Sequence, residues 1–140
     1  MTVLSHHTPN RIRPPFARYS HGVSILPGHR LVFCSGQLGI GPDDHVPPDA
    51  REQADLCFSN IDAVLRDAGA TPSHVVRVNA FVTGREHLAG YMAARDAYFE
   101  SVEPPPASTL MVVSGFAREA FLVEVEVIAA VPDEETNDVI

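Results

Sequence analysis

The sequence predicts an α+β fold of two layers, in which two helices pack on one face of a mixed β-sheet. Two segments, around 50–69 and 86–100, have the apolar spacing of amphipathic helices, whereas several others are rich in β-branched residues. The predicted order is β-β-α-β-α-β-β, with strands both in runs and in alternation with helices. The chain has 140 residues and 45% apolar content, enough for a single domain, 1–140, with its own core.

The N-terminal region predicts an extended arm followed by a hairpin. Residues 1–15 contain several prolines and little hydrophobic periodicity, which is typical of an extended arm. Two strands are predicted next, around 20–26 and 30–36. Pro27 and Gly28 lie between them, and a Pro-Gly bend of this length predicts a β-hairpin.

The clearest helix follows a loop rich in glycine, proline and aspartate at 39–48. Asp49, with Glu52 three residues later, predicts its N-terminus, and Gly69 stands where a left-handed C-cap belongs. The spacing i, i+3, i+4, i+7 marks one buried stripe. The stripe consists of Ala54, Cys57, Phe58, Ile61, Val64, Leu65 and Ala68.

The second half of the chain continues the alternation. A strand is predicted at 74–82, and the helix at 86–100 ends before three consecutive prolines. Strands at 107–113 and 121–131 follow, and the chain ends in an acidic tail, 132–140.

The last predicted strand has different side chains on its two faces. Alternation places Glu124 and Glu126 on one face and the intervening valines on the other. Since two helices cover only one face of the sheet, we expect the other face to pack against further copies of the chain.

The charge of the chain excludes several partners and cofactors. Ten basic residues, all arginine, face 18 acidic residues, which gives a net charge of −8. A phosphate backbone requires a basic surface, so nucleic acid is not an expected partner. The absence of lysine excludes a Schiff-base or pyridoxal-phosphate lysine and a Walker-type phosphate lysine. No cofactor is expected.

Cysteine, histidine and hydropathy patterns point to an unexported protein without a metal. Cys34 and Cys57 lie in apolar contexts and are expected to be buried, unreactive thiols. The histidines lack the spacing of metal ligands. No apolar run approaches the ~20 residues that span a bilayer, and no secretory segment begins the chain, so no membrane association and a cytoplasmic location are expected.

Motifs along residues 14–131 resemble those of the RidA (YjgF/YER057c/UK114) family. They are Tyr19-Ser20, Ser35-Gly36-Gln37, the helix DLCFSNIDAVLRDAG, and the segments VVRVNAFVT, DAYF, PPPAST and VEVEVIA. The resemblance implies a chorismate-mutase-like fold and a homotrimer whose sheets line a central barrel. It also implies three clefts between neighbouring subunits, each of which binds a small molecule.

Members of this family hydrolyse reactive enamines and imines, such as 2-aminoacrylate, to a 2-keto acid and ammonia. An arginine in a P-A-R-S stretch binds the substrate carboxylate through its planar fork. A glutamate on the last strand positions the attacking water, and a tyrosine and a glycine backbone shape the cleft. The resemblance assigns these last roles to Glu124, Tyr19 and Gly36, with Gln37 beside the glycine.

Four positions depart from the family pattern. Ala107 stands where the family has the arginine, and Thr109 stands where it has a cysteine. Met92 replaces an asparagine, and His21 replaces a glutamine. Loss of the charged clamp puts classical 2-aminoacrylate deaminase activity in doubt, and the more apolar pocket predicts an altered specificity.

Several of these residues have a structural interpretation beside the functional one. His21 lies two residues after Tyr19, so both side chains point the same way in an extended segment. It can act as an acid–base group or be a structural histidine. Glu124 can orient water or be a strand-face charge, like Glu126.

Another arginine can replace the missing clamp. Arg18, directly before Tyr19, and Arg118, in the turn before the last strand, are the candidates. Arg77 and Arg95 are expected to be a strand-face and a helix-face charge.

The sequence therefore predicts a Rid-like enzyme that acts on an imine, an enamine or a related unsaturated compound. The alternative is a non-catalytic trimer that binds a small molecule and serves a regulatory role. A ribonuclease is disfavoured by the net charge of −8.

Overall fold

The computed structural model describes residues 4–133 and has the predicted α+β class. The predicted acidic tail lies outside this range from residue 134 onward. Two single turns of 3₁₀ helix, η1 and η2, precede β4 and α2. The elements in chain order are β1 (Leu4–His7), β2 (Gly22–Ile25), β3 (His29–Leu38), α1 (Ala50–Asp67), η1 (Pro72–His74), β4 (Val75–Val82), η2 (Arg85–His87), α2 (Leu88–Tyr98), β5 (Ala107–Val112) and β6 (Val123–Pro132).

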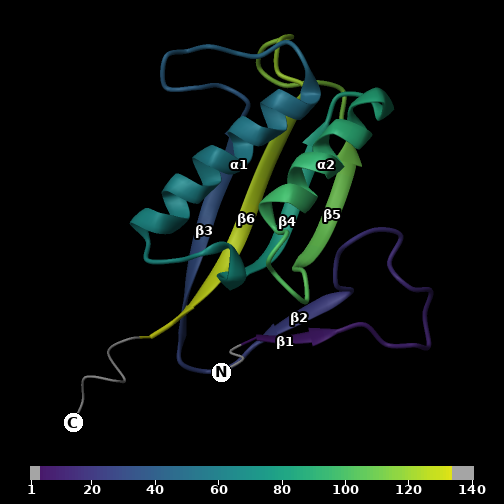
Figure 1. The fold of residues 1–140 in the computed structure, drawn as a ribbon, viewed down its shortest axis with the longest axis vertical. Helices are drawn as coiled ribbons and strands as arrows, with labels where there is room; N and C mark the ends of the chain where they lie inside the picture. Colours follow the sequence, from purple (N-terminus) through teal and green to yellow (C-terminus); the bar gives the residue numbers. More distant parts are fainter. Residues whose placement is uncertain (1–3, 134–140) are drawn as a thin grey trace.

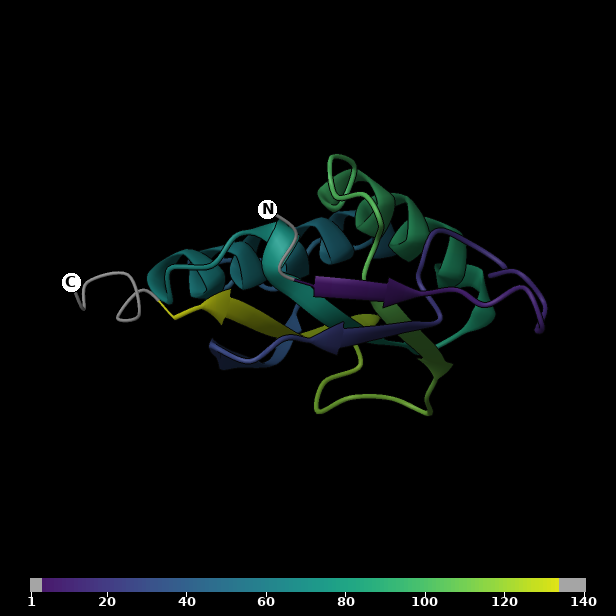
Figure 2. The same ribbon diagram turned by 90° about the horizontal axis from the view of Figure 1, so that it is seen from below.

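The main sheet is mixed and has the strand order β3-β6-β4-β5. Strands β4 and β5 are parallel, whereas β6 is antiparallel to both of its neighbours. Both helices lie on one face of this sheet, as predicted, and leave the opposite face without a helix (Figures 1 and 2). We call this opposite face the open face.

The longest helix begins and ends where its sequence predicts. Asp49 is the N-cap of α1, and its carboxylate accepts a hydrogen bond from the backbone N–H of Glu52 at 2.8 Å. At the other end, Gly69 has a φ of +78°, the left-handed conformation that favours glycine.

The predicted hairpin between β2 and β3 was wrong. Strand β2 pairs with β1, in the register Leu4↔Ile25, and β3 pairs with β6. The bend at Gly28, with a φ of +87°, directs the chain from the β1-β2 ribbon into the main sheet and does not pair β2 with β3. Part of the expected N-terminal arm is therefore a strand, and it satisfies the backbone of β2.

The two-stranded ribbon of β1 and β2 lies at one end of the main sheet (Figures 1 and 2). Leu4 of β1 forms a small apolar cluster with Val76 of β4 and Ala130 of β6, joined by Val23 of β2 and Ile128. Leu4 and Val76 are 72 residues apart in the sequence, and therefore no local pattern predicts their contact.

The main core lies between the helices and the sheet. Val123 and Val125 of β6 are fully buried, and Phe58 of α1 stacks on Tyr98 of α2 with ring centroids 5.1 Å apart. Both cysteines are free and buried, as predicted. Burial, assisted by the nearby Glu124, raises the pKa of Cys57 to about 12, so this thiol is protonated and unreactive at neutral pH.

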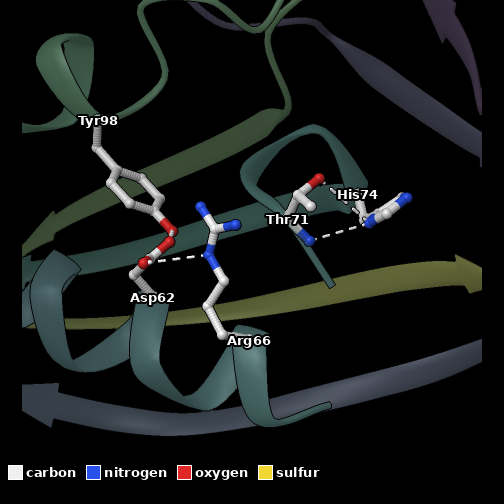
Figure 3. Close-up of polar contacts among 5 residues, drawn as sticks. All are labelled: Asp62, Arg66, Thr71, His74 and Tyr98. Carbon is white, nitrogen blue, oxygen red and sulfur yellow. Dashed lines mark hydrogen bonds and ion pairs between the residues drawn. The ribbon is translucent and has the colours of Figure 1, made fainter. Parts of the chain in front are cut away.

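A polar contact also joins the two helices. The hydroxyl of Tyr98 donates a hydrogen bond to the Asp62 carboxylate at 2.8 Å, and Arg66 lies 3.4 Å from the other oxygen of Asp62 (Figure 3). Burial and the hydrogen bond to Asp62 raise the pKa of the Tyr98 hydroxyl. Tyr98 and Asp62 are therefore engaged with each other in holding α2 against α1.

Gln53, on α1, is fully buried and connects two loops at one end of the sheet. Its amide nitrogen donates to the carbonyls of Pro47, at 2.9 Å, and Ala120, at 2.7 Å. Its amide oxygen accepts from the backbone N–H of Leu122 at 2.8 Å. These three bonds fix the loop before α1 to the loop before β6.

We predict that Gln53→Leu lowers the free energy of unfolding by about 2–4 kcal/mol, because it removes the three hydrogen bonds of a fully buried side chain to the backbone of two loops. Urea titration followed by circular dichroism measures this change. Ser59→Ala, at an exposed position of the same helix, is the matched control and should change stability little. Equal stabilities for the two variants would contradict the role given to Gln53.

Candidate functional site

Glu124 and Gly36 meet on the open face of the sheet. Glu124, in β6, lies opposite Leu38 of β3 and Phe81 of β4. A register shift between Cys34 and Gln37 brings the Gly36 backbone against it. A β-carbon at position 36 would lie 2.8 Å from the carboxyl carbon of Glu124, so only glycine leaves room for the carboxylate in this position.

The two glutamates of β6, equivalent by alternation, differ in their partners. Glu126 accepts a hydrogen bond from the side-chain amide of Asn79 at 3.1 Å. Within residues 4–133, the Glu124 carboxylate has neither a hydrogen bond nor an ion pair. Burial and the neighbouring charge of Glu126 raise the pKa of Glu124. Glu124 is thus free to bind a water molecule or a ligand.

Two of the predicted site residues, His21 and Ala107, line a pocket of about 410 Å³ where β2 meets the open face. Ala107 and Arg77 occupy paired positions on β5 and β4, and the Arg77 guanidinium donates to the Thr109 hydroxyl at 2.7 Å. The pocket is lined by His21, Gly22, Val23, Ile25, Leu31, Phe33, Val76, Arg77, Ala107 and Ile128.

His21 is partly engaged with its own loop. Its Nε2 atom lies 2.8 Å from the carbonyl oxygen of Arg13, which requires a proton on this nitrogen. Its ring also contacts that of Tyr19 edge-on, with centroids 5.9 Å apart. The two rings therefore contact each other, but His21 and Tyr19 line different pockets.

Tyr19 and Met92 meet at a different pocket, of about 280 Å³, beside the edge strand β5. The Tyr19 hydroxyl oxygen accepts a hydrogen bond from the backbone N–H of Phe16 at 3.2 Å, which fixes the ring. Successive residues of a strand point to opposite faces, so Ala107 lines one pocket and Ser108 the other. We call this second space the Arg95 pocket; it is lined by Phe16, Ala17, Tyr19, Met92, Arg95, Ser108 and Leu110.

Arg95 corrects the expectation of a helix-face charge. It is only 4% exposed, and it lines a pocket together with two residues that the sequence had singled out. Arg95 lies one helical turn after Tyr91, which is itself fully buried. The spacing of four residues from Tyr91 indicates that Arg95 lies on the buried side of the helix. A buried arginine is uncommon, however, so the residue type favours a surface position.

The other polar residues of interest lie outside both pockets. Arg18 donates to the carbonyl of Val102 and lies 3.4 Å from Glu103, so it is tied to the loop before β5. The Arg118 guanidinium lies over the ring of Phe121 at 5.3 Å. Gln37 donates its side-chain amide to the carbonyl of Ser35 at 3.1 Å.

Glu124 is separated from Ala107 along the sheet. On β4, Arg77 is paired with Ala107 and Phe81 with Glu124, and these two positions are four residues apart. A strand rises about 3.3 Å per residue, so the offset along the strand is about 13 Å. A small ligand at Glu124 cannot reach Ala107 within one chain.

The structure contains no cluster of metal ligands in its described part. Among residues 4–133, histidine, cysteine, aspartate and glutamate side chains form no group of three or more that could hold a metal ion. Over the same range, no helix has both the length and the apolar character that are needed to cross a membrane.

The sequence is similar to those of known proteins over most of its length. Residues 9–131 match the family described as Endoribonuclease L-PSP. The RutC family protein YjgH of Escherichia coli is 32% identical over 120 residues, which cover 85% of this chain and 88% of that protein. A protein of Dermatophagoides farinae named 2-iminobutanoate/2-iminopropanoate deaminase is 29% identical over 119 residues, or 84% of this chain and 88% of that protein.

A solved structure shows the same fold. The Rid family protein YyfB of Yersinia pestis, whose function its description calls unknown, superposes with a TM-score of 0.83 at 29% identity. The match covers 93% of this chain and all of that one.

The raised pKa of Glu124 gives a prediction for stability. A carboxyl group whose pKa is higher in the folded than in the unfolded state favours folding when protonated, and this contribution is lost as pH rises through the folded pKa. Glu124→Gln cannot ionise, so its melting temperature should rise relative to the unchanged protein between pH 4 and pH 7.

Glu126→Gln is the matched control, because its carboxylate already accepts a hydrogen bond from Asn79. It should not show the same relative gain. Thermal scans across this pH range give both values, and parallel curves for Glu124→Gln and the unchanged protein would show that Glu124 is fully solvated.

Proposed function

The chain belongs to the Endoribonuclease L-PSP family, as one of its Rid (YjgF/YER057c/UK114) proteins, and on this basis we propose that it is an enzyme that hydrolyses a small imine, enamine or related unsaturated compound. The observation that carries the proposal is the Glu124 carboxylate, which lies against the Gly36 backbone without a partner among the described residues. The name of the Dermatophagoides farinae relative supports the reaction class.

The proposed reaction requires only a carboxylate, a water molecule and the backbone beside them. Glu124 orients a water molecule and accepts one of its protons while the water oxygen bonds to the imine carbon. The imine nitrogen takes up a proton as the carbinolamine forms, and Glu124 then returns its proton to this nitrogen. The C–N bond breaks as the hydroxyl group loses its proton to solvent, which gives ammonia and the carbonyl product. The Gly36 backbone borders the reacting group, while Tyr19 and His21 form walls of the cleft.

We propose that the cleft is completed between copies of the chain in a homotrimer. The offset of about 13 Å between Glu124 and Ala107 supports this, since a second copy can bring the two halves together. The open face supports it as well. Phe33 is 71% exposed there and Leu31 is 49% exposed, and exposed apolar side chains of this kind mark an interface.

The ribonuclease activity in the family description has little support in this chain. The net charge is −8 and lysine is absent, whereas binding to an RNA backbone depends on a basic surface. We therefore place the activity on small molecules.

We predict a particle of three times the 15.2 kDa chain mass in size-exclusion chromatography with light scattering at micromolar concentration. Phe33→Asp should shift it to monomers, because it places a charge on an apolar interface. Val64→Asp, on the exposed side of α1, is the control and should leave the mass unchanged. A monomeric unchanged protein would remove the proposed clefts.

We predict that Glu124→Gln lowers turnover by about 100-fold or more while the fold and the oligomer persist, because general acid–base groups contribute on this scale. Gly36→Ala should act similarly, since its β-carbon would displace the carboxylate. Release of ammonia from a panel of imines and enamines, generated in place by amino-acid oxidation, measures the effect. Glu126→Gln is the control and should retain most of the activity.

Normal turnover by Glu124→Gln would reduce this carboxylate to a strand-face charge and contradict the proposal. If no compound is turned over and Glu124→Gln loses binding of a ligand instead, the non-catalytic binding protein is the correct description.

A further inference from the structure

The Arg95 pocket contains a buried cation that the chain itself leaves incompletely satisfied. The side chain of Arg95 is 5% exposed, on α2, and it lines the pocket of about 280 Å³ between α2, β5 and the segment around Tyr19. A guanidinium withdrawn from water must find acceptors for its N–H groups, or its burial costs free energy.

The only ion pair of Arg95 within residues 4–133 is with its neighbour Asp96. Nε donates to Oδ1 of Asp96 at 3.1 Å. Nη2 lies 3.0 Å from the same oxygen, but it has no hydrogen-bond partner, since the geometry is satisfied for Nε alone. One oxygen of a half-exposed carboxylate therefore serves two nitrogens, and donor capacity remains on the buried guanidinium.

The walls of the pocket fit a small organic anion. None of the residues that line it is acidic, and Arg95 is the only charged one. Met92, Leu110 and the Phe16 ring supply apolar surface, while Ser108 supplies a hydroxyl group. A space of about 280 Å³ is near the lower limit of small-ligand pockets, which suits a compound with a short chain.

We propose that Arg95 binds the carboxylate of a short-chain organic acid in this pocket, with the rest of the molecule against Met92 and Leu110. A carboxylate fits better than a phosphate dianion, because a single guanidinium, part of whose charge Asp96 already offsets, can balance at most one negative charge. Ser108 of the pocket follows Ala107, the position at which the family resemblance places an arginine. The anion-binding group has thus moved from the strand to the facing helix.

This inference deepens the proposed function, since it names a carboxylate-bearing substrate, but binding can be tested without turnover. The probes are pyruvate and its uncharged ester, methyl pyruvate, measured by titration calorimetry with the full chain. Pyruvate should bind, and methyl pyruvate should bind at least about tenfold more weakly, because charge-assisted hydrogen bonds are among the strongest. Equal binding of the two compounds would overturn the proposal.

Variants locate the effect. Arg95→Gln should weaken pyruvate binding by about tenfold or more, and Arg95→Lys should weaken it less, since it keeps the charge but loses the planar fork. Asp96→Asn should strengthen binding, because it removes the competing carboxylate; an arginine with a purely structural role would lose stability in this variant without gaining affinity. Arg118→Gln, in an exposed loop, is the control for general charge effects.

The outcomes of these binding measurements either support or overturn the role proposed for Arg95. Undiminished pyruvate binding by folded Arg95→Gln would overturn the proposal, as would tighter binding of inorganic phosphate than of pyruvate. Should Arg95→Gln fail to fold, Arg95→Lys and Asp96→Asn still give opposite expected shifts. Glu126→Gln, outside the Arg95 pocket, should bind pyruvate about as well as the unchanged protein. Pyruvate binding that depends on Arg95 without any imine turnover would therefore retain this inference and reject the proposed enzyme.

Discussion

The alternation of side chains along β6 is the constraint on which the rest of the structure depends. This strand lies in the middle of the main sheet, between β3 and β4, and its valines are buried under the helices. A shift of one residue would expose these valines and bury Glu124 and Glu126 in the core, at a cost of several kcal/mol. The same packing that stabilises the domain therefore holds Glu124 on the open face.

The spacing of apolar residues and the capping residues were sufficient to predict where the main helix begins and ends. The cap of α1 at Asp49 and its stop at Gly69 are present, and most of the predicted stripe is buried. Val64 is the exception: it is 37% exposed, because it lies at the margin of the stripe, away from the sheet. The pairing of β2 was not predictable in this way. Its partner is fixed by contacts of Leu4 and Val23 with Val76, far away in the sequence, and a Pro-Gly bend is compatible with a hairpin or with a change of direction.

The sequence predicted which residues belong to the candidate site, but not how buried they are or which hydrogen bonds they make. Alternation makes Glu124 and Glu126 equivalent, and only the structure shows that Asn79, from β4, engages one and leaves the other free. Arg95, in contrast, was not predicted to belong to a site. Its spacing from Tyr91 puts it on an inward stripe, yet residue type alone assigns it to the surface, because burial of an arginine depends on pocket geometry that no single helix encodes.

The buried guanidinium also connects ligand binding with stability. In the empty protein, the unsatisfied nitrogen of Arg95 opposes folding, and the single exposed-side partner, Asp96, offsets this only in part. An anion that enters the pocket removes that cost and binds only to the folded chain, so it stabilises the fold by mass action. The chain is thus less stable without a ligand than it would be with a hydrophobic residue at position 95, and a bound anion restores part of that stability. The apolar walls of Met92 and Leu110 strengthen the effect, because they lower the local dielectric in which the two charges meet.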